Sequence, residues 1–294
     1  MTFEPIWGGP IAWYLFLAGL GGGAFVTSAF LAWRHPEATN MQKVGHIIAP
    51  VVIVIGLVLL MFDAEAGLHH PLRFALLLHN PLSVMTWGVV FLACFTVISM
   101  IVVALDFFKK KIPAWLNIIG VVFAVCVAMY TGALLGVCKT FPLWNSAILP
   151  ILFLVSAMSA GAASVLLVGA LKFGEEFNEV GLFKKAHFAL PWIEMVLIAA
   201  LLFITCYVSP AGQESVLGLL IGHFAPLFWL GLVFIGLVIP AGVDTWLLFF
   251  AHKEFEESRK AQLIAAGCSA GVLIGGFLLR YLVVVAAMPL AYVI

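Results

Sequence analysis

Charged residues are scarce in this sequence. Only 10% of its 294 residues are Asp, Glu, Lys or Arg, whereas 64% are hydrophobic and the mean hydropathy is +1.18. A soluble domain of that composition would have too little polar surface to stay in solution. No stretch is long or polar enough to form an extramembrane domain, so any soluble chemistry must come from another protein. The net charge of zero argues against nucleic acid as a partner.

Clustered cysteines and mid-span histidines are also lacking. No C-x-x-C pair occurs, which argues against an iron–sulfur cluster or another metal site in this chain. A membrane haem needs axial histidines on facing helices, but the histidines lie at the edges of the apolar segments, so no haem is expected. The cysteines, interpreted as small core residues, are Cys94, Cys126, Cys138, Cys206 and Cys268. The histidines are His35, His46, His69, His70, His79, His187, His223 and His252.

Long apolar runs dominate what is present. A helix needs roughly 20 apolar residues to cross a bilayer, and the chain has room for about eight such helices with short loops. The N-terminus holds Glu4 and no basic residue, so the first run is expected to be a retained span and not a signal peptide. The sequence therefore predicts an all-α integral membrane protein. Its predicted spans are 10–33, 44–63, 83–105, 113–136, 145–171, 187–208, 224–250 and 262–288.

The loop charges predict the orientation of these spans. If the N-terminus faces outward, the outer loops hold only Arg73 and Lys139. The inner loops then hold Arg34, Lys43, Lys109, Lys110, Lys111, Lys172, Lys184, Lys185, Lys253, Arg259 and Lys260. This bias places both termini on the outer side, which is the periplasm if the membrane is the inner membrane of a bacterium.

A weak internal repeat relates the two halves of the chain. Leu15-Phe16-Leu17 precedes a run of small residues, and so does Leu152-Phe153-Leu154. Because four spans form an even repeat unit, the halves 1–140 and 141–294 are predicted to be parallel four-helix bundles. The Gly19 and Gly23 pair would allow close helix packing.

Two outer segments, 67–82 and 209–223, are apolar and rich in Pro, Gly and His. Apolar loops of this kind usually pack against something. We expect them to form a docking surface for a partner on the outer face. The alternative is that they are re-entrant segments buried within this protein.

Ionisable residues in or near the spans are candidate functional groups, because charge is costly within a bilayer. Asp63, Glu65 and Arg73 lie near the outer end of the second span, and the alternative is that they are simply exposed to water. Ionisable residues at staggered depths could form a proton path. The candidates are the acids Asp63, Glu194 and Asp244, together with Arg280. The alternative for Glu194 and Asp244 is a buried carboxyl that is protonated or hydrogen-bonded.

Tyr14 and Tyr130 are predicted to lie at similar depth in the outer half of the membrane, near Asp63 and Glu65. A phenol can hydrogen-bond a quinone carbonyl, and nearby acids can accept protons from a quinol. The alternative is that each tyrosine anchors its helix at the membrane interface.

Several segments resemble the NrfD/polysulfide reductase family of membrane subunits. They are WYLFLAGLGGGAF (13–25), HPLRFALLLHNPLSVMTWG (70–88), YTGALLG (130–136), PLWNSAILPILFLVSAMSAGAA (142–163) and HFAPLFWLG (223–231). The resemblance implies an eight-helix subunit without a redox cofactor of its own. Such subunits exchange electrons between membrane quinone, either menaquinone or ubiquinone, and a four-cluster iron–sulfur protein. That protein connects to a molybdopterin or multihaem cytochrome subunit.

The resemblance also implies a quinone site near the outer face, with Tyr14 and Tyr130 at the contacting positions. The family's acid–Gly–basic–Pro-Arg-like turn corresponds to residues 65–73, which contain His69 and Arg73 and begin at Glu65; the acid is Glu65 or Asp63. The first hypothesis is therefore a quinone-handling subunit of a respiratory oxidoreductase. The alternatives are a secondary transporter of a small solute and a purely structural anchor.

Overall fold

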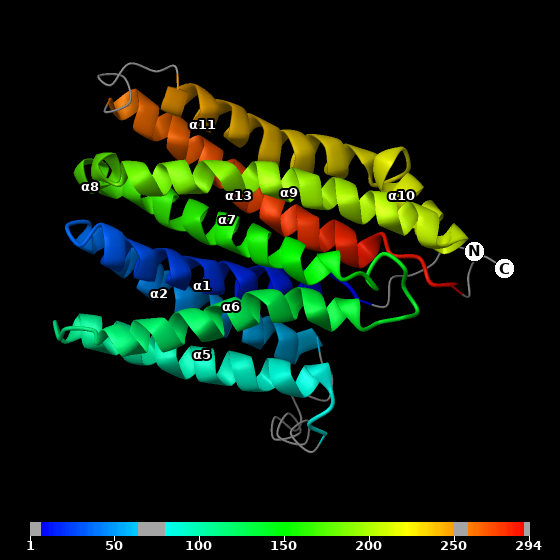
Figure 1. The fold of residues 1–294 in the computed structure, drawn as a ribbon, viewed down its shortest axis with the longest axis horizontal. Coiled ribbons are helices and arrows are strands. Elements are labelled where there is room, and N and C mark those ends of the chain that lie inside the picture. The colour runs from blue at the N-terminus through cyan, green and yellow to red at the C-terminus, as the bar shows by residue number, and fades with distance from the viewer. Residues whose placement is uncertain (1–6, 64–79, 250–257, 291–294) are drawn as a thin grey trace.

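The computed structural model describes residues 7–63, 80–249 and 258–290, and Figure 1 shows its ribbon. Within these ranges the chain is all-helical and has no strand. Eight of the helices are long and apolar enough to cross a membrane, which confirms the predicted number of spans. They are 9–34, 39–62, 84–107, 114–136, 148–172, 188–208, 227–247 and 259–285.

The long helices lie side by side in Figure 1, with short helices at both ends. The first four are α1 (Gly9–Arg34), α2 (Thr39–Asp63), α5 (Val84–Phe107) and α6 (Ala114–Gly136). The next are α7 (Ile148–Lys172), α9 (Gly181–Val208), the pair η2 (Leu227–Val238) and α11 (Ile239–Phe249), and α13 (Arg259–Val285). The short helix α8 (Gly174–Glu179) lies at one end of the molecule and α10 (Pro210–Leu220) at the other. An even number of spans brings the start of α1 and the end of α13 to the end that carries α10.

Helix α1 is the central element of the fold. In its apolar window 78% of residues are buried, against 28% for α5 and for α9. Lipid is as apolar as leucine, so helices in a membrane associate through close packing of small residues. Three consecutive glycines of α1 face three different helices, because successive residues on a helix point about 100° apart. A Cβ on Gly21 would lie 2.9 Å from the Ala49 oxygen of α2, one on Gly22 2.8 Å from the Ala124 oxygen of α6, and one on Gly23 1.9 Å from the Ala157 oxygen of α7.

Two contacts at the lysine-rich end hold helix ends in place. The Glu176 carboxylate of α8 accepts hydrogen bonds from the backbone N–H groups of Asn40 and Met41, at 3.3 and 3.0 Å, and so satisfies the exposed start of α2. The Arg259 guanidinium donates to the backbone oxygens of Ala170 and Leu171, in the last turn of α7. The start of α2 is therefore fixed by the second half of the chain, whereas the end of α7 is fixed within that half.

The predicted docking segment 209–223 is largely helical and packs partly against this protein. Most of it forms α10, whose first turn is capped by the Ser209 hydroxyl accepting from the Gly212 N–H at 3.1 Å. One face of α10 is buried against this protein, and the Ser215 hydroxyl accepts from the Met288 N–H at 2.9 Å. The opposite face, with Leu217 and Ile221, is exposed. The other predicted docking segment, 67–82, lies almost entirely outside the described residues.

The seventh span is irregular in the middle of the membrane. Its first twelve residues, Leu227–Val238, form a π-helix, and Pro240 follows directly in α11. Proline has no N–H and its ring would clash with the carbonyl four residues earlier in an α-helix, whereas a π-helix has a wider turn. Pro50 and Pro191 also lie inside α2 and α9. Three of the spans therefore carry a proline within a helix.

Candidate functional site

Tyr14 of α1 and Tyr130 of α6 come together in the half of the molecule that the loop charges predict to be outer. Tyr14 is five residues from the start of α1 and Tyr130 six from the end of α6, so each lies roughly 8–9 Å below that end. Their side chains are 3% and 6% exposed, which differs from an interfacial anchor exposed to lipid and water. Their phenol groups are close enough to interact electrostatically. The structure thus places both oxygens in one buried region.

A glycine makes room for the Tyr130 ring, and a second glycine lies beside Tyr14. A Cβ on Gly88 of α5 would lie only 1.7 Å from Cζ of Tyr130 and 2.1 Å from its hydroxyl oxygen. On the other side, a Cβ on Gly56 of α2 would be 3.6 Å from Cδ2 of Tyr14, an ordinary contact. The site is therefore built where α1, α2, α5 and α6 meet. Sequence reasoning missed Gly88, although it lies in the segment that carries the family resemblance.

No hydrogen bond joins either phenol oxygen to another residue that the structure describes. A phenol can donate one hydrogen bond and accept others, so both groups are chemically suited to a polar ligand. Of the other residues predicted for this site, Glu65, His69 and Arg73 lie outside the described residues. Asp63 is the last residue of α2, and its side chain is also outside the described part of the structure.

Arg280 of α13 lies in the centre of the protein, with none of its side chain exposed. Its guanidinium donates to the Ser156 hydroxyl at 3.0 Å and to the backbone oxygens of Gly276 and Phe153 at 2.7 and 3.2 Å. The rings of Phe16 and Phe153 lie 5.8 and 5.0 Å from its central carbon, within cation–π range. A buried cation held in this way joins α1, α7 and α13.

Glu194 and Arg280 were predicted as separate members of a proton path, and the structure brings their charges into interaction. Glu194 is 2% exposed, and α9 begins at Gly181, six residues before the predicted start of that span. The residue lies near the middle of α9 and six residues from the start of its apolar span, Phe188–Val208. Asp244 of α11 interacts instead with Cys268 of α13, nearer the lysine-rich end.

One polar pair was not predicted from the sequence. His46 of α2, expected at the membrane edge, is 2% exposed and lies seven residues inside its helix, about 10 Å from the end. Its Nδ1 is 3.1 Å from the Asp106 carboxylate of α5. The two residues are 60 positions apart, so only the packing of α2 on α5 reveals the pair.

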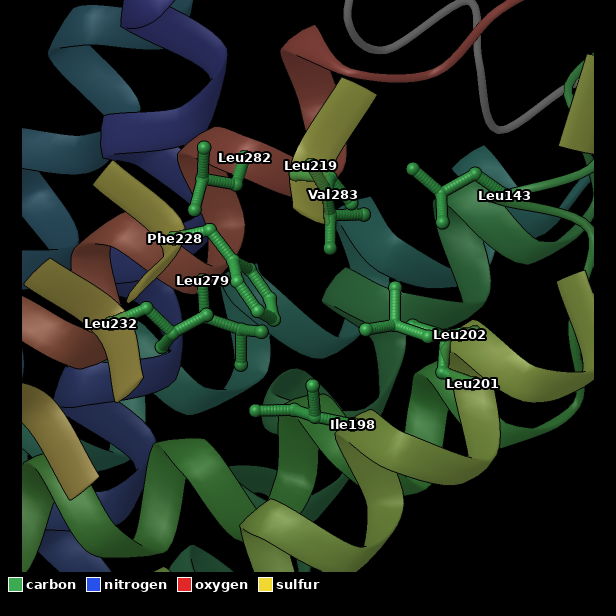
Figure 2. Close-up of a pocket in the computed structure, with 10 residues that line it drawn as sticks. All are labelled: Leu143, Ile198, Leu201, Leu202, Leu219, Phe228, Leu232, Leu279, Leu282 and Val283. Atoms are coloured by element: carbon green, nitrogen blue, oxygen red, sulfur yellow. The ribbon is translucent and has the colours of Figure 1, made fainter. Parts of the chain in front are cut away.

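A narrow apolar cavity lies among α9, α10, η2 and α13 (Figure 2). Its lining is Leu143, Ile198, Leu201, Leu202, Leu219, Phe228, Leu232, Leu279, Leu282 and Val283. No side chain of this lining can donate or accept a hydrogen bond, so the cavity offers nothing to orient a polar head group. The paired phenols are the better candidate for binding one.

Comparison with known proteins finds relatives over most of the chain. The family model described as "Polysulphide reductase, NrfD" matches residues 1–290. A polysulfide reductase chain of Wolinella succinogenes is 34% identical, covering 94% of this sequence and 93% of that protein. Protein NrfD of Escherichia coli is 27% identical, covering 96% and 94%. A selenate reductase subunit of Mesobacillus selenatarsenatis is 24% identical, covering 82% and 66%.

Proposed function

Since this chain belongs to the polysulphide reductase NrfD family, we propose that it is the membrane anchor and quinone-reactive subunit of a respiratory oxidoreductase complex. It passes electrons between membrane quinone and a partner iron–sulfur subunit. The chain itself supplies the quinone site and the membrane spans, and the terminal substrate is handled by another subunit.

The observation that carries this proposal is the buried pair of phenols. A quinone head group has two carbonyl acceptors, and a quinol has two hydroxyls that can exchange hydrogen bonds with a phenol. Tyr130, packed against Gly88, donates to one carbonyl, and Tyr14 places a second phenol beside it. Oxidation of a quinol releases two electrons and two protons; the electrons go to the partner's clusters. The acids Asp63 and Glu65, at the end of α2 and just beyond it, accept the protons.

Partners are proposed from the names of the relatives, which are single chains or subunits of polysulfide, selenate and tetrathionate reductases. A four-cluster, ferredoxin-like subunit docks on the end that carries α10, next to the tyrosines. A molybdopterin or multihaem cytochrome subunit binds to it in turn. That end faces the periplasm if the membrane is the inner membrane of a bacterium, which is the orientation that the loop charges favour.

A proton path through the second half is proposed for Glu194, Arg280 and Asp244. Arg280 lies five residues before the end of α13 that reaches the α10 end, Glu194 lies near the middle of α9, and Asp244 lies nearer the lysine-rich end. Glu194 and Arg280 interact with each other, and Asp244 interacts with Cys268. Neutralising both acids, Glu194→Gln with Asp244→Asn, is expected to alter turnover or proton coupling. Unchanged values of both would make the two acids structural.

The test of the proposed function is the loss of one hydroxyl. Tyr130→Phe removes a hydrogen bond worth on the order of 0.5–1.5 kcal/mol, more if a buried carbonyl stays unpaired. We expect weaker binding of a quinone analogue and lower quinol-linked activity, with unchanged folding, assembly and activity with artificial electron donors. Tyr207→Phe is the matched control. Tyr207 is near the end of α9, on the same side of the molecule as Tyr130, but its side chain is 77% exposed.

Wild-type quinol kinetics and analogue affinity in Tyr130→Phe would show that Tyr130 is only an anchor. A purified protein that binds no quinone analogue, but takes up a small solute into vesicles, would favour the transporter alternative. The irregular seventh span is a structural feature on the side of that alternative.

A further inference from the structure

An apolar groove runs between α2 and α5 at the end of the molecule that carries the lysine-rich turns. Its volume is about 570 Å³, which is within the range of ligand sites. Several lining side chains, including Val51, Ile55 and Met100, are about half exposed. The full lining is Pro50, Val51, Val54, Ile55, Met100, Val103, Ala104, Phe107 and Phe108.

Three consecutive lysines stand at the mouth of this groove. Lys109, Lys110 and Lys111 follow directly after Phe107 and Phe108, which line it, and all three are exposed. Among the described residues, none of the three lies within ion-pair distance of a carboxylate. Three exposed lysines with no ion-pair partner among the described residues therefore follow directly on the residues that line the groove.

The turn that carries these lysines is well defined by its backbone hydrogen bonds. The Lys110 N–H donates to the Leu105 oxygen at 2.9 Å, and the Lys109 N–H donates to the Asp106 oxygen at 3.0 Å. Lys109 has a φ of 53°, in the left-handed region that ends many helices, although glycine is the usual residue there. The lysines are thus held at a fixed place beside the last turn of α5.

The opposite wall of the groove also ends in a basic residue. Lys43 precedes Ile47 and Val51 of α2 at four-residue spacing, so the three side chains lie on one face of that helix. Lys43 and Ile47 are both exposed. Each wall is therefore apolar along its length and cationic at the same membrane surface.

From this combination we propose that the groove between α2 and α5 is a binding site for one anionic phospholipid. An acyl chain lies in the groove, and the head-group phosphate lies among Lys43 and Lys109 to Lys111. Basic residues at the membrane surface attract anionic head groups, and a groove that runs from that surface between two spans has the shape of an acyl chain. A partner helix or a quinone tail would fill the groove but would leave the lysines without an anion.

The experiment measures phospholipid binding to the purified full-length protein by native mass spectrometry. The probes are palmitoyl-oleoyl phosphatidylglycerol and palmitoyl-oleoyl phosphatidylcholine, which share acyl chains and differ in head-group charge. We expect phosphatidylglycerol to bind about tenfold more tightly or better, because each surface lysine adds to the attraction. Changing Lys109, Lys110 and Lys111 together to Gln should remove that preference. The variant Lys172→Gln with Lys260→Gln, exposed lysines at the same end of other helices, should keep it.

A second pair of variants tests the groove. Ala104→Trp fills it and should reduce binding of both lipids, whereas Val97→Trp, on an exposed part of α5 outside the groove, should not. Equal binding of the two lipids, or a preference that survives the triple lysine change, would overturn the proposal. So would displacement of phosphatidylglycerol by a long-chain quinone, or a dimer that Ala104→Trp alone abolishes. These readouts do not depend on quinol activity, so they stand apart from the proposed function.

Discussion

At the scale of single residues, Gly88 determines where the Tyr130 ring can lie. A methyl group at this position would overlap the ring, with Cβ 1.7 Å from Cζ, so Gly88→Ala must displace the phenol or separate α5 from α6. Overpacking of this kind costs about 1–3 kcal/mol. We expect Gly88→Ala to weaken binding of a quinone analogue at least as much as Tyr130→Phe does.

The comparison variant for this prediction is Gly242→Ala, since a Cβ on Gly242 meets nothing within 4 Å. Binding of the analogue, measured by isothermal titration with each purified variant, should be normal for Gly242→Ala. Normal binding by Gly88→Ala as well would mean that the position of the Tyr130 ring does not matter for the site.

Arg280 and Glu194 are expected to be coupled in stability. The two buried charges interact electrostatically, so removing one leaves the other buried with less compensation, at a cost on the order of a few kcal/mol. Arg280→Met should therefore strongly lower the thermal stability of the detergent-solubilised protein. Adding Glu194→Gln should cost less than the sum of the two single changes. Strict additivity in this cycle would show that the two residues act independently.

At the scale of elements, the glycine run of α1 fixes three helix contacts at once. Gly23→Ala is predicted to destabilise the protein more than Gly22→Ala or Gly21→Ala does. A Cβ at position 23 would lie 1.9 Å from the backbone oxygen of Ala157, whereas a Cβ at position 22 or 21 would lie 2.8 or 2.9 Å from the nearest backbone oxygen. Thermal unfolding in detergent measures this difference. Equal stabilities of the three variants would contradict it.

The sequence predicted the eight spans because each is a long apolar run, and it predicted close packing from Gly19 and Gly23. It could not show which helix each glycine faces. Gly23 packs on α7, but Gly19 makes room for the Arg280 guanidinium. A Cβ on Gly19 would lie 2.9 Å from Nη2 of Arg280. The His46–Asp106 pair was missed for the same reason, since it depends on the register between two helices. The π-helical start of span seven has no periodic signal that distinguishes it from an α-helix.

At the scale of the whole molecule, Arg280 lies where the two halves of the repeat meet. Aligning Leu15-Phe16-Leu17 with Leu152-Phe153-Leu154 makes Phe16 equivalent to Phe153 and Gly19 equivalent to Ser156. All four residues surround the Arg280 guanidinium. This arrangement supports the proposal that residues 1–140 and 141–294 are related four-helix units, with α1 and α7 as equivalent helices in contact.

The orientation of the whole molecule can be tested with two exposed lysines at opposite ends. Lys139 follows α6 at the end that carries α10, and Lys110 lies in the turn between α5 and α6. Natural Cys138 should be changed to Ala first, although burial raises the pKa of its thiol and leaves less thiolate to react at neutral pH.

A membrane-impermeant maleimide added to intact spheroplasts should then label Lys139→Cys and spare Lys110→Cys until the membrane is opened. Complex assembly should also protect Lys139→Cys, because the proposed iron–sulfur partner covers that end. Labelling of Lys110→Cys alone would place the tyrosine pair near the cytoplasm and move the partner to the opposite side.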